Sequence, residues 1–505
     1  MNSSNIKNLI NYAYEHLNLN KLDELYVRNR LLEACFMEEY DEETISNDEL
    51  IDVVGLDYPD SIINPILDEL IETGKVSNDQ REYYLCKIMD IMSLKPSEVE
   101  AKFKEISKET NTSDAFKWLH SYSEHNSYIK LSDIRKNMMW EVSDEKGGLI
   151  VTINLSKPEI TNVTVKKPVV TSKPKYPKCV ICPENMGYAG HGTTRQNLRG
   201  LNMRLGTEDW FWQFSPYAYF NEHGIAINSS HTPMVVEPKN ITNVLDFIDF
   251  VPEYFIGFNA ALPIVGGSIL AHDHYQGGRC VLPVFNSKDK YLFESKEYPN
   301  VKVSILNWYN SVVRLVSSSR SELEALAQKI VVTWKSYDDI ENNIIAKTDA
   351  QHSSITCIAR YVDGKYIMDL ILRNNCTSEE HPDGIYHAHK EYHNIKKEAI
   401  GLIEAGGMFI LPARLKRQLA VVSSTLQGMD LNELTEDMMV HKDMIDRLIA
   451  EHGIDNSLEK ANNIVKLEIE RICREILYNT AVYKETEEGI KGFINYLNSI
   501  DLKLI

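Results

Sequence analysis

The stretch GGSILAHDHYQGG, from Gly266 to Gly278, carries polar side chains at every second position, namely His272, His274 and Gln276. If this stretch is a β-strand, alternate residues project from one face, so the two imidazoles and the carboxamide converge. Glycine pairs flank the strand: one lets a ligand approach the backbone, and the other allows the chain to turn. The pattern predicts a strand that presents phosphate-binding groups. A strand whose polar face is simply solvated is the alternative.

The run His-x-His-x-Gln is similar to the active-site signature of the galactose-1-phosphate uridylyltransferases, a family of the histidine triad superfamily. Here Asp273 and Tyr275 are the spacers, where better-described relatives carry proline and glycine. With these spacers, the sequence resembles the second type of the enzyme, which is found in Gram-positive bacteria. Further points of similarity are the long amino-terminal extension and the runs CVICPENMGYAG (179–190) and IKKEAIGLIEAGG (395–407). The resemblance extends from about Tyr26 to Leu415.

The resemblance implies a ping-pong reaction in two steps. UDP-glucose gives glucose 1-phosphate and a uridylyl-enzyme, and galactose 1-phosphate then takes up the uridylyl group as UDP-galactose. It assigns His274 as the nucleophile, His272 as its orienting or metal-binding partner, and Gln276 as the residue where related hydrolases tend to carry a third histidine. A neutral imidazole is a good nucleophile near pH 7 and the departing phosphate is a weak base, so no strong general acid is required. We expect no cofactor in the chemistry. Glutamine can neither protonate a leaving group nor activate water, so the intermediate should survive.

Substrate-binding roles follow from the same resemblance. The glycine-rich segment would supply backbone amides to the phosphates, and one polar side chain would line the nucleotide pocket. The run at 395–407 would reach the sugar, although its spacing differs by one residue from that in the first type of the enzyme. An asparagine followed by Glu-His-Gly also has the composition of a turn. The predicted residues are Gly266, Gly267, Ser268, Asn221, Lys397, Gly401 and Glu404.

Cys179 and Cys182 have a two-residue spacing that suits one corner of a tetrahedral zinc site. In first-type relatives such a pair binds a structural metal with the first histidine of the active-site run, here His272, and one histidine further upstream. The segment around Asn240 has no histidine at the aligned position. A reduced pair without metal is the alternative. Three histidines are candidates for the missing ligand: His191, His223 and His231.

His387 and His389 repeat the His-x-His spacing about one domain's length downstream. The repeat predicts a duplicated core in which one copy kept the full active-site set. In relatives the second pair helps to hold a structural metal, so both residues are candidate ligands. The alternative is a strand with hydrogen-bonded histidines and no metal.

The chain's 505 residues suffice for two or three cores. We expect an α+β fold with a duplicated histidine-triad-like antiparallel sheet core, divided into a helical region (1–148), a first half with the nucleophile (149–286), a second half (287–425) and a C-terminal helical segment (426–505). Residues 149–155 alternate as a strand, and 355–372 predict two strands joined at Asp363-Gly364. Arg28 and Arg30 could reach a phosphate, but solvating a helix face is their simpler role.

A net charge of −19 argues against sequence-independent binding of nucleic acid. The sequence contains no apolar run of about 18 residues, so no membrane span is predicted. The first residues do not resemble a secretory signal. The spacing of the eight cysteines does not indicate a disulfide framework. We therefore expect a cytoplasmic enzyme, and the family implies a homodimer. Two other functions stay open: a nucleotide phosphorylase or adenylyl transferase on the same scaffold, and a nucleotide-binding protein without a covalent intermediate.

Overall fold

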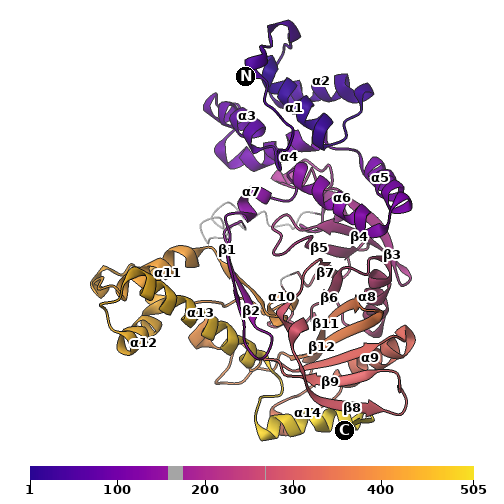
Figure 1. The fold of residues 1–505 in the computed structure, drawn as a ribbon, viewed down its shortest axis with the longest axis vertical. Coiled ribbons are helices and arrows are strands. Elements are labelled where there is room, and N and C mark those ends of the chain that lie inside the picture. The colour runs from indigo at the N-terminus through magenta and orange to yellow at the C-terminus, as the bar shows by residue number, and fades with distance from the viewer. Residues whose placement is uncertain (157–174, 268) are drawn as a thin grey trace. The chain divides into compact units, whose positions relative to one another are not determined.

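The computed structural model describes residues 1–156, 175–267 and 269–505 (Figure 1). The chain forms two compact units. Unit 1 comprises the described residues of Met1–Lys136, Asn162–Thr232 and Gln276–Arg279, and unit 2 those of Asn137–Thr161, Pro233–Tyr275 and Cys280–Ile505. Both units combine helices with strands, so the expected α+β class is confirmed. The division into four segments remains a prediction.

Unit 1 begins with helices and continues with a strand meander. β4 pairs antiparallel with both β3 and β5. Along β4, Trp212 and Phe214 share one face because alternate residues point the same way, and the Trp212 ring meets Phe116 of α6 edge-on at 5.7 Å. The elements are α1 (Ser3–His16), α2 (Glu24–Ala34), α3 (Asp60–Glu72), α4 (Arg81–Met92), α5 (Pro96–Glu109), α6 (Thr112–His125), α7 (Leu131–Ile134), β3 (Gly200–Leu205), β4 (Glu208–Phe214) and β5 (Gly224–Asn228).

Within unit 2, the strands of the larger sheet follow the order β14-β8-β9-β10-β12-β11-β6-β7. The last strand, β7 (His274–Gly278), begins in unit 2 and ends in unit 1. Helices α8 (Pro238–Phe250) and α9 (Arg320–Trp334) lie side by side along this sheet (Figure 1). The other strands are β6 (Phe255–Phe258), β8 (Asp289–Ser295), β9 (Lys302–Leu306), β10 (Val312–Ser317), β11 (Ser353–Val362), β12 (Lys365–Asn374) and β14 (Leu502–Leu504).

The predicted strand pair at 355–372 is confirmed as the β11–β12 hairpin. Its turn residues, Asp363 and Gly364, have φ values of 51° and 75°. Two successive residues with positive φ characterise the tight turns that match the right-handed twist of a hairpin, and Asp-Gly is a favoured pair there. Local turn chemistry therefore sets the register of the two longest strands.

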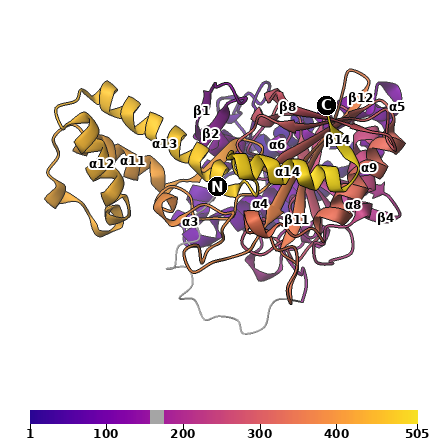
Figure 2. The same cartoon turned by 90° about the horizontal axis from the view of Figure 1, so that it is seen from below.

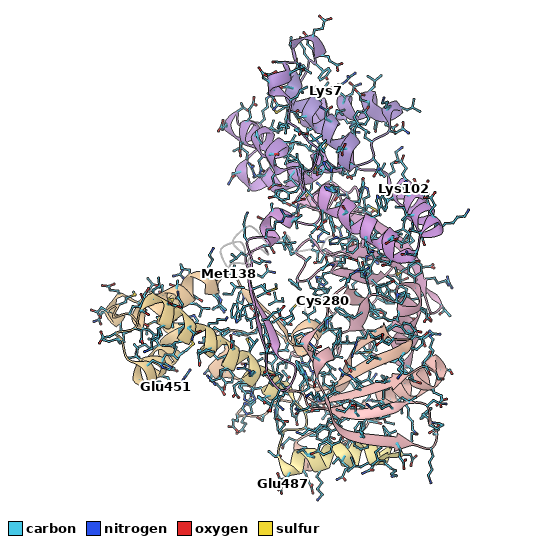
Figure 3. All side chains as sticks on the ribbon, in the orientation of Figure 1. Lys7, Lys102, Met138, Cys280, Glu451 and Glu487 are labelled. Atoms are coloured by element: carbon cyan, nitrogen blue, oxygen red, sulfur yellow. The ribbon has the colours of Figure 1, made fainter. Side chains whose placement is uncertain are left out.

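A smaller sheet of unit 2 has the order β1-β2-β13. Its strands are β1 (Met138–Val142), β2 (Leu149–Asn154), which confirms the strand predicted at 149–155, and β13 (Met408–Pro412). β1 pairs antiparallel with β2, whereas β13 pairs with it in parallel. Met138, labelled in Figure 3, is 44% exposed at the start of β1.

The remaining helices of unit 2 are α10 (Leu402–Ala405), α11 (Arg414–Thr425), α12 (Lys442–His452), α13 (Leu458–Thr480) and α14 (Glu487–Ser499). Three of them, α11, α12 and α13, form a helical group (Figure 2), which confirms that the C-terminal segment is helical. Within the parts of the chain that the structure describes, no helix has the length and apolar character needed to cross a bilayer.

Asp369 of β12 is fully buried between two arginines. Arg314 donates from Nε and Nη2 at 2.6 and 3.0 Å, and Arg360 donates from Nη1 at 2.7 Å. Burial alone would raise the pKa of Asp369, but the guanidinium groups of Arg360 and Arg314 outweigh it and hold the pKa below its usual value. Because the folded pKa is lowered, this contribution to stability is present above about pH 4 and is lost as the pH falls through the folded pKa.

Asp369→Asn should lower the apparent free energy of unfolding by about 3–5 kcal/mol, because it leaves two buried guanidinium groups without a counter-charge. Chemical denaturation at pH 7 measures the loss. The exposed Asp455→Asn is the matched control and should change little. An Asp369→Asn protein as stable as its control would contradict the role assigned to this carboxylate.

Candidate active site

β7 begins at His274, so His272 precedes the strand and only the second half of the predicted run is extended. Tyr275 is fully buried, and its hydroxyl accepts hydrogen bonds from Asn240 Nδ2 at 2.8 Å and Asn243 Nδ2 at 3.0 Å, both on α8. Because alternate residues of a strand face opposite ways, this anchoring turns His274 and Gln276 to the other face. This agrees with the predicted alternation for His274 and Gln276, whereas His272, the third side chain expected to converge, lies before the strand.

The orientation of the His274 ring is fixed by a backbone group. Its Nδ1 lies 2.8 Å from the carbonyl oxygen of His272. A carbonyl can only accept, so Nδ1 carries the proton and Nε2 keeps its lone pair. Burial lowers the pKa of His274, and the bond to the carbonyl opposes part of that shift. At neutral pH the imidazole is therefore neutral, with one nucleophilic nitrogen.

The glycine pair before the histidines lies against the segment that follows β6. Gly267 has a φ of +81°, and a Cβ there would lie 2.9 Å from Nδ2 of Asn259. A Cβ on Gly266 would lie 2.4 Å from the backbone nitrogen of Leu262. Both positions therefore need glycine, because a side chain would push the turn away. Ser268 lies outside the described residues.

Asn259, which directly follows β6, joins this turn to the second predicted run. Its Oδ1 accepts a hydrogen bond from the backbone of Leu402 at 2.7 Å, and a Cβ on Gly401 would lie 3.1 Å from the same oxygen. Asn259 is 3% exposed. The sequence interpretation missed it, although a polar residue directly after a buried strand and before a glycine-rich segment is a usable signal.

Glu404 is held by two donors. Lys396 Nζ donates to Oε1 at 2.8 Å, and the backbone nitrogen of Gly401 donates to Oε2 at 3.1 Å. The lysine beside Glu404 is thus Lys396, which is 6% exposed, whereas the predicted Lys397 is exposed. The structure therefore brings Gly401 and Glu404 together but not Lys397. Lys396, one position before the predicted residue, is the lysine that pairs with Glu404.

His387 and His389 lie in a loop. Nδ1 of His387 is 3.2 Å from the carbonyl oxygen of Ala388, and Nε2 of His389 is 3.2 Å from that of Ile385. The His389 ring stacks on His381 with centroids 4.0 Å apart. Among the described residues, neither histidine belongs to a group of three or more potential metal ligands. Both histidines are hydrogen-bonded, as in the alternative, but they lie in a loop and not in the expected strand, and a metal here remains a prediction.

Cys179 and Cys182 gather with one histidine of unit 1. Sγ of Cys182 lies 3.4 Å from Sγ of Cys179 and 3.2 Å from Nδ1 of His231. Asn185 Nδ2 donates to the carbonyl oxygens of both cysteines at 2.9 Å, which fixes the turn between them. Two thiols and an imidazole are the donor set that zinc prefers. Of the three candidate histidines, His231 is the one that lies beside Cys182.

The other two candidates for that ligand lie apart from the cysteines. His191 is exposed in a turn with a φ of 54°. His223 is buried against Tyr219 and Phe220, and burial lowers its pKa to about 4. His272, the expected ligand of the active-site run, is 1% exposed in unit 2.

Asn221 is exposed at the turn before β5, and its carboxamide donates to Glu222 at 3.3 Å, as the turn composition suggested. Arg28 pairs with Glu24 of its own helix at 3.8 Å and lies over the Tyr40 ring, and Arg30 pairs with Glu33 at 3.3 Å. Both arginines therefore pair with glutamates of their own helix, which agrees with the simpler expectation that they solvate a helix face.

Comparison with known proteins agrees with this geometry. The chain matches the sequence profiles "Galactose-1-phosphate uridyl transferase, N-terminal domain" over residues 21–233 and "Galactose-1-phosphate uridyl transferase, C-terminal domain" over residues 247–443. It is 36% identical over 513 residues to a galactose-1-phosphate uridylyltransferase of Caldanaerobacter subterraneus subsp. tengcongensis, covering 99% of this chain and 98% of the relative. For galactose-1-phosphate uridylyltransferase 1 of Streptococcus pneumoniae serotype 4 the identity is 37% over 506 residues, with coverage of 98% and 99%.

Among solved structures, the yeast Ap4A phosphorylase Apa2 aligns with 71% of this chain and 93% of its own, at 10% identity and a TM-score of 0.29. The family assignment comes from the sequence matches, which span nearly the whole length of both partners. The chain therefore belongs to the galactose-1-phosphate uridylyltransferase family.

Proposed function

We propose that this protein transfers a uridylyl group from UDP-glucose to galactose 1-phosphate through a covalent uridylyl-His274 intermediate. The observation that carries the proposal is the hydrogen bond from His274 Nδ1 to the His272 carbonyl, because it leaves Nε2 as a neutral nucleophile. Family membership supports the identity of the substrates.

In the first step, Nε2 of His274 attacks the α-phosphorus and an N–P bond forms. The bond from phosphorus to the bridging oxygen breaks, and its electron pair leaves with glucose 1-phosphate. In the second step, a phosphate oxygen of galactose 1-phosphate attacks, and the N–P electron pair returns to Nε2. No proton moves at Nε2 in either step. The Nδ1–H bond to the carbonyl stabilises the positive charge that the ring acquires.

The groups around the reacting phosphate serve mainly to offset charge. Gly266 and Gly267 allow the backbone to approach the phosphates closely, and Gln276 follows His274 on the same face of β7. We assign the sugar end to the loop that carries Gly401 and Glu404, since Asn259 holds this loop near the glycine turn. Lys397 and Ser268 stay predictions from the resemblance.

We also propose a structural zinc ion held by Cys179, Cys182, His231 and His272. The first three are already grouped in unit 1, and His272 lies four residues before Gln276, where β7 enters that unit. Bound zinc would supply no step of the reaction. It would fix the His272 backbone, whose carbonyl holds the His274 ring. A homodimer and a cytoplasmic location remain expectations from the family.

With His274→Ala, exchange of labelled glucose 1-phosphate into UDP-glucose should fall by at least roughly 10⁴-fold, because the covalent step loses its nucleophile. Wild-type enzyme should catalyse this exchange without galactose 1-phosphate, as a ping-pong route requires. His452→Ala, on the exposed end of α12, is the control. Exchange only when galactose 1-phosphate is present would contradict the proposal; exchange with an adenine nucleotide instead would favour the adenylyl transferase alternative.

Purified protein should contain about one zinc per chain, as a four-ligand structural site requires. Cys182→Ser and His231→Ala should each lose that zinc and unfold at a lower temperature, because binding energy is also folding energy. Cys376→Ser, which changes a cysteine far from this group in sequence, should keep the metal. Elemental analysis and thermal unfolding provide the readouts, and full zinc content in His231→Ala would exclude His231 as a ligand.

Asn259→Asp should lower kcat/KM by about 100-fold, because it keeps the acceptor for Leu402 but replaces an amide donor with a negative charge beside the phosphate-binding turn. Steady-state kinetics with both substrates measures the change. Asn286→Asp makes the same substitution at an exposed position and should be neutral. Equal activity of the two variants would remove Asn259 from the site.

A further inference from the structure

Arg373 of β12 is a buried cation that the fold leaves without a counter-charge. It is 1% exposed, and its Nη1 donates to the carbonyl oxygen of Ile400 at 2.9 Å. Among the described residues, Nε and Nη2 have no hydrogen-bond partner, and no carboxylate pairs with this guanidinium. Burial lowers the pKa of Arg373 to about 10. The group therefore stays charged at neutral pH.

The stability of the fold does not explain an arginine at this position. On the same strand, Asp369 compensates the charges of Arg314 and Arg360, and Arg373 has no comparable partner. A buried charge without compensation costs free energy, and each buried donor without an acceptor adds to that cost. The contact with Ile400 therefore indicates what the arginine does.

Arg373 holds one end of a peptide group whose other end holds Glu404. The carbonyl of Ile400 accepts from Arg373, and the N–H of Gly401, in the same peptide group, donates to Glu404 Oε2 at 3.1 Å. A peptide group is planar, so a fixed carbonyl also fixes the direction of the N–H. The position of the guanidinium therefore sets the position of Oε2. All of these residues belong to unit 2.

The loop of Ile400–Glu404 is held from one face of the larger sheet. Gly257 of β6 and Asp369 of β12 share a face, because β11 pairs with both strands at one residue. Alternation adds Asn259 and Arg373 to that face. A Cβ on Gly257 would lie 2.5 Å from Cδ1 of Leu402, so the loop covers this face. Asn259 holds the N–H of Leu402, and Arg373 holds the carbonyl two residues earlier. The sheet therefore fixes the loop at two points.

Glu404 keeps capacity for a ligand. Its side chain is 12% exposed, whereas Arg373 and Lys396 are 1% and 6% exposed. A carboxylate offers about four lone-pair positions. Lys396 Nζ and the Gly401 N–H occupy two of them. The positions that are left can accept hydrogen bonds from the hydroxyl groups of a sugar.

We propose that Arg373 is a positioning residue for the sugar end of the site, and that it acts through the Ile400–Gly401 peptide to aim the Glu404 carboxylate at a hydroxyl group of the hexose. Arg373 itself does not touch the substrate. Without it, the peptide can rotate and Oε2 loses its backbone donor. This inference rests on the proposed uridylyl transfer, in which the loop of Gly401 and Glu404 forms the sugar end.

The first test is Arg373→Met, which removes the donor and the charge but keeps a long unbranched side chain. The KM values for galactose 1-phosphate and glucose 1-phosphate should rise by about 10-fold with kcat changed far less, because a hydrogen bond to the hexose is lost in the ground state and the transition state alike. The dissociation constant of UMP, which has no hexose, should not change. Arg204→Met, at an exposed position of β3, is the control. Equal weakening of UMP and both sugar phosphates would overturn the proposal.

Thermal unfolding separates positioning from support of the fold. Arg373→Met should unfold at the wild-type temperature or above it, because the cation that it removes has no counter-charge. Arg373→Lys keeps a cation and a donor, and should recover part of the lost affinity for galactose 1-phosphate. A lower unfolding temperature in Arg373→Met, together with equal KM values in the two variants, would assign the arginine to the fold and overturn the proposal.

A double-mutant cycle with Glu404→Ala tests the route of the effect. If Arg373 acts through Glu404, Arg373→Met should raise the KM for galactose 1-phosphate no further in the Glu404→Ala background. Independent increases that multiply in the double variant would show that the arginine acts on the substrate by another route, and would overturn the proposal.

Hydrogen–deuterium exchange of the wild-type enzyme covers the case in which Arg373→Met does not fold. A mixture of UDP-glucose and glucose 1-phosphate should slow exchange at the Gly401 amide, since a hexose on Glu404 holds Oε2 against this donor, whereas UMP alone should not. Exchange that does not depend on the hexose would overturn the proposal.

The wild-type exchange of labelled glucose 1-phosphate into UDP-glucose separates the two levels of inference. Its absence would refute the proposed function and this inference together. Normal exchange in the wild type, with unchanged KM values in Arg373→Met, would refute the role of Arg373 alone.

Discussion

The hydrogen bond between His274 Nδ1 and the carbonyl oxygen of His272 is the constraint on which the site depends. It fixes the tautomer, aims Nε2 and stabilises the charge that the ring would gain. The bond needs a rigid backbone on both sides. After the histidine, Tyr275 is anchored by two asparagines of α8. Before it, the proposed zinc would hold the His272 ring, so a metal without a chemical role would still control the nucleophile.

His274 and the loop of Gly401 and Glu404 belong to unit 2, whereas Gln276 and the cysteine group belong to unit 1. Asn259 connects the glycine turn to the sugar-side loop within unit 2. A spacer residue of the active-site run therefore has a structural role. The Tyr275 hydroxyl needs hydrogen-bond partners that a glycine would not need, and its anchoring determines which face of the strand carries His274.

Features set by short-range rules could be predicted from the sequence. These include the β11–β12 turn at Asp363-Gly364, the strand at 149–154 and the paired cysteines. Features set by long-range packing could not. Either neighbouring lysine could have paired with Glu404, and burial selects Lys396. The sequence offered three candidate histidines for the proposed zinc site. Only the path of the chain after β5 places one of them, His231, beside Cys182. The position of Asn259 after a buried strand marks it as a candidate, but its contact with Leu402, 143 residues away, could not be predicted from the sequence.

Intact-protein mass spectrometry after mixing the enzyme with UDP-glucose and no acceptor, followed by peptide mapping under conditions that preserve acid-labile phosphoramidates, tests the central claim most directly. The account predicts one uridylyl group per chain, on the peptide that contains His274, and its loss when galactose 1-phosphate is added. A uridylyl group on another residue, or turnover with no adduct at any time, would contradict it.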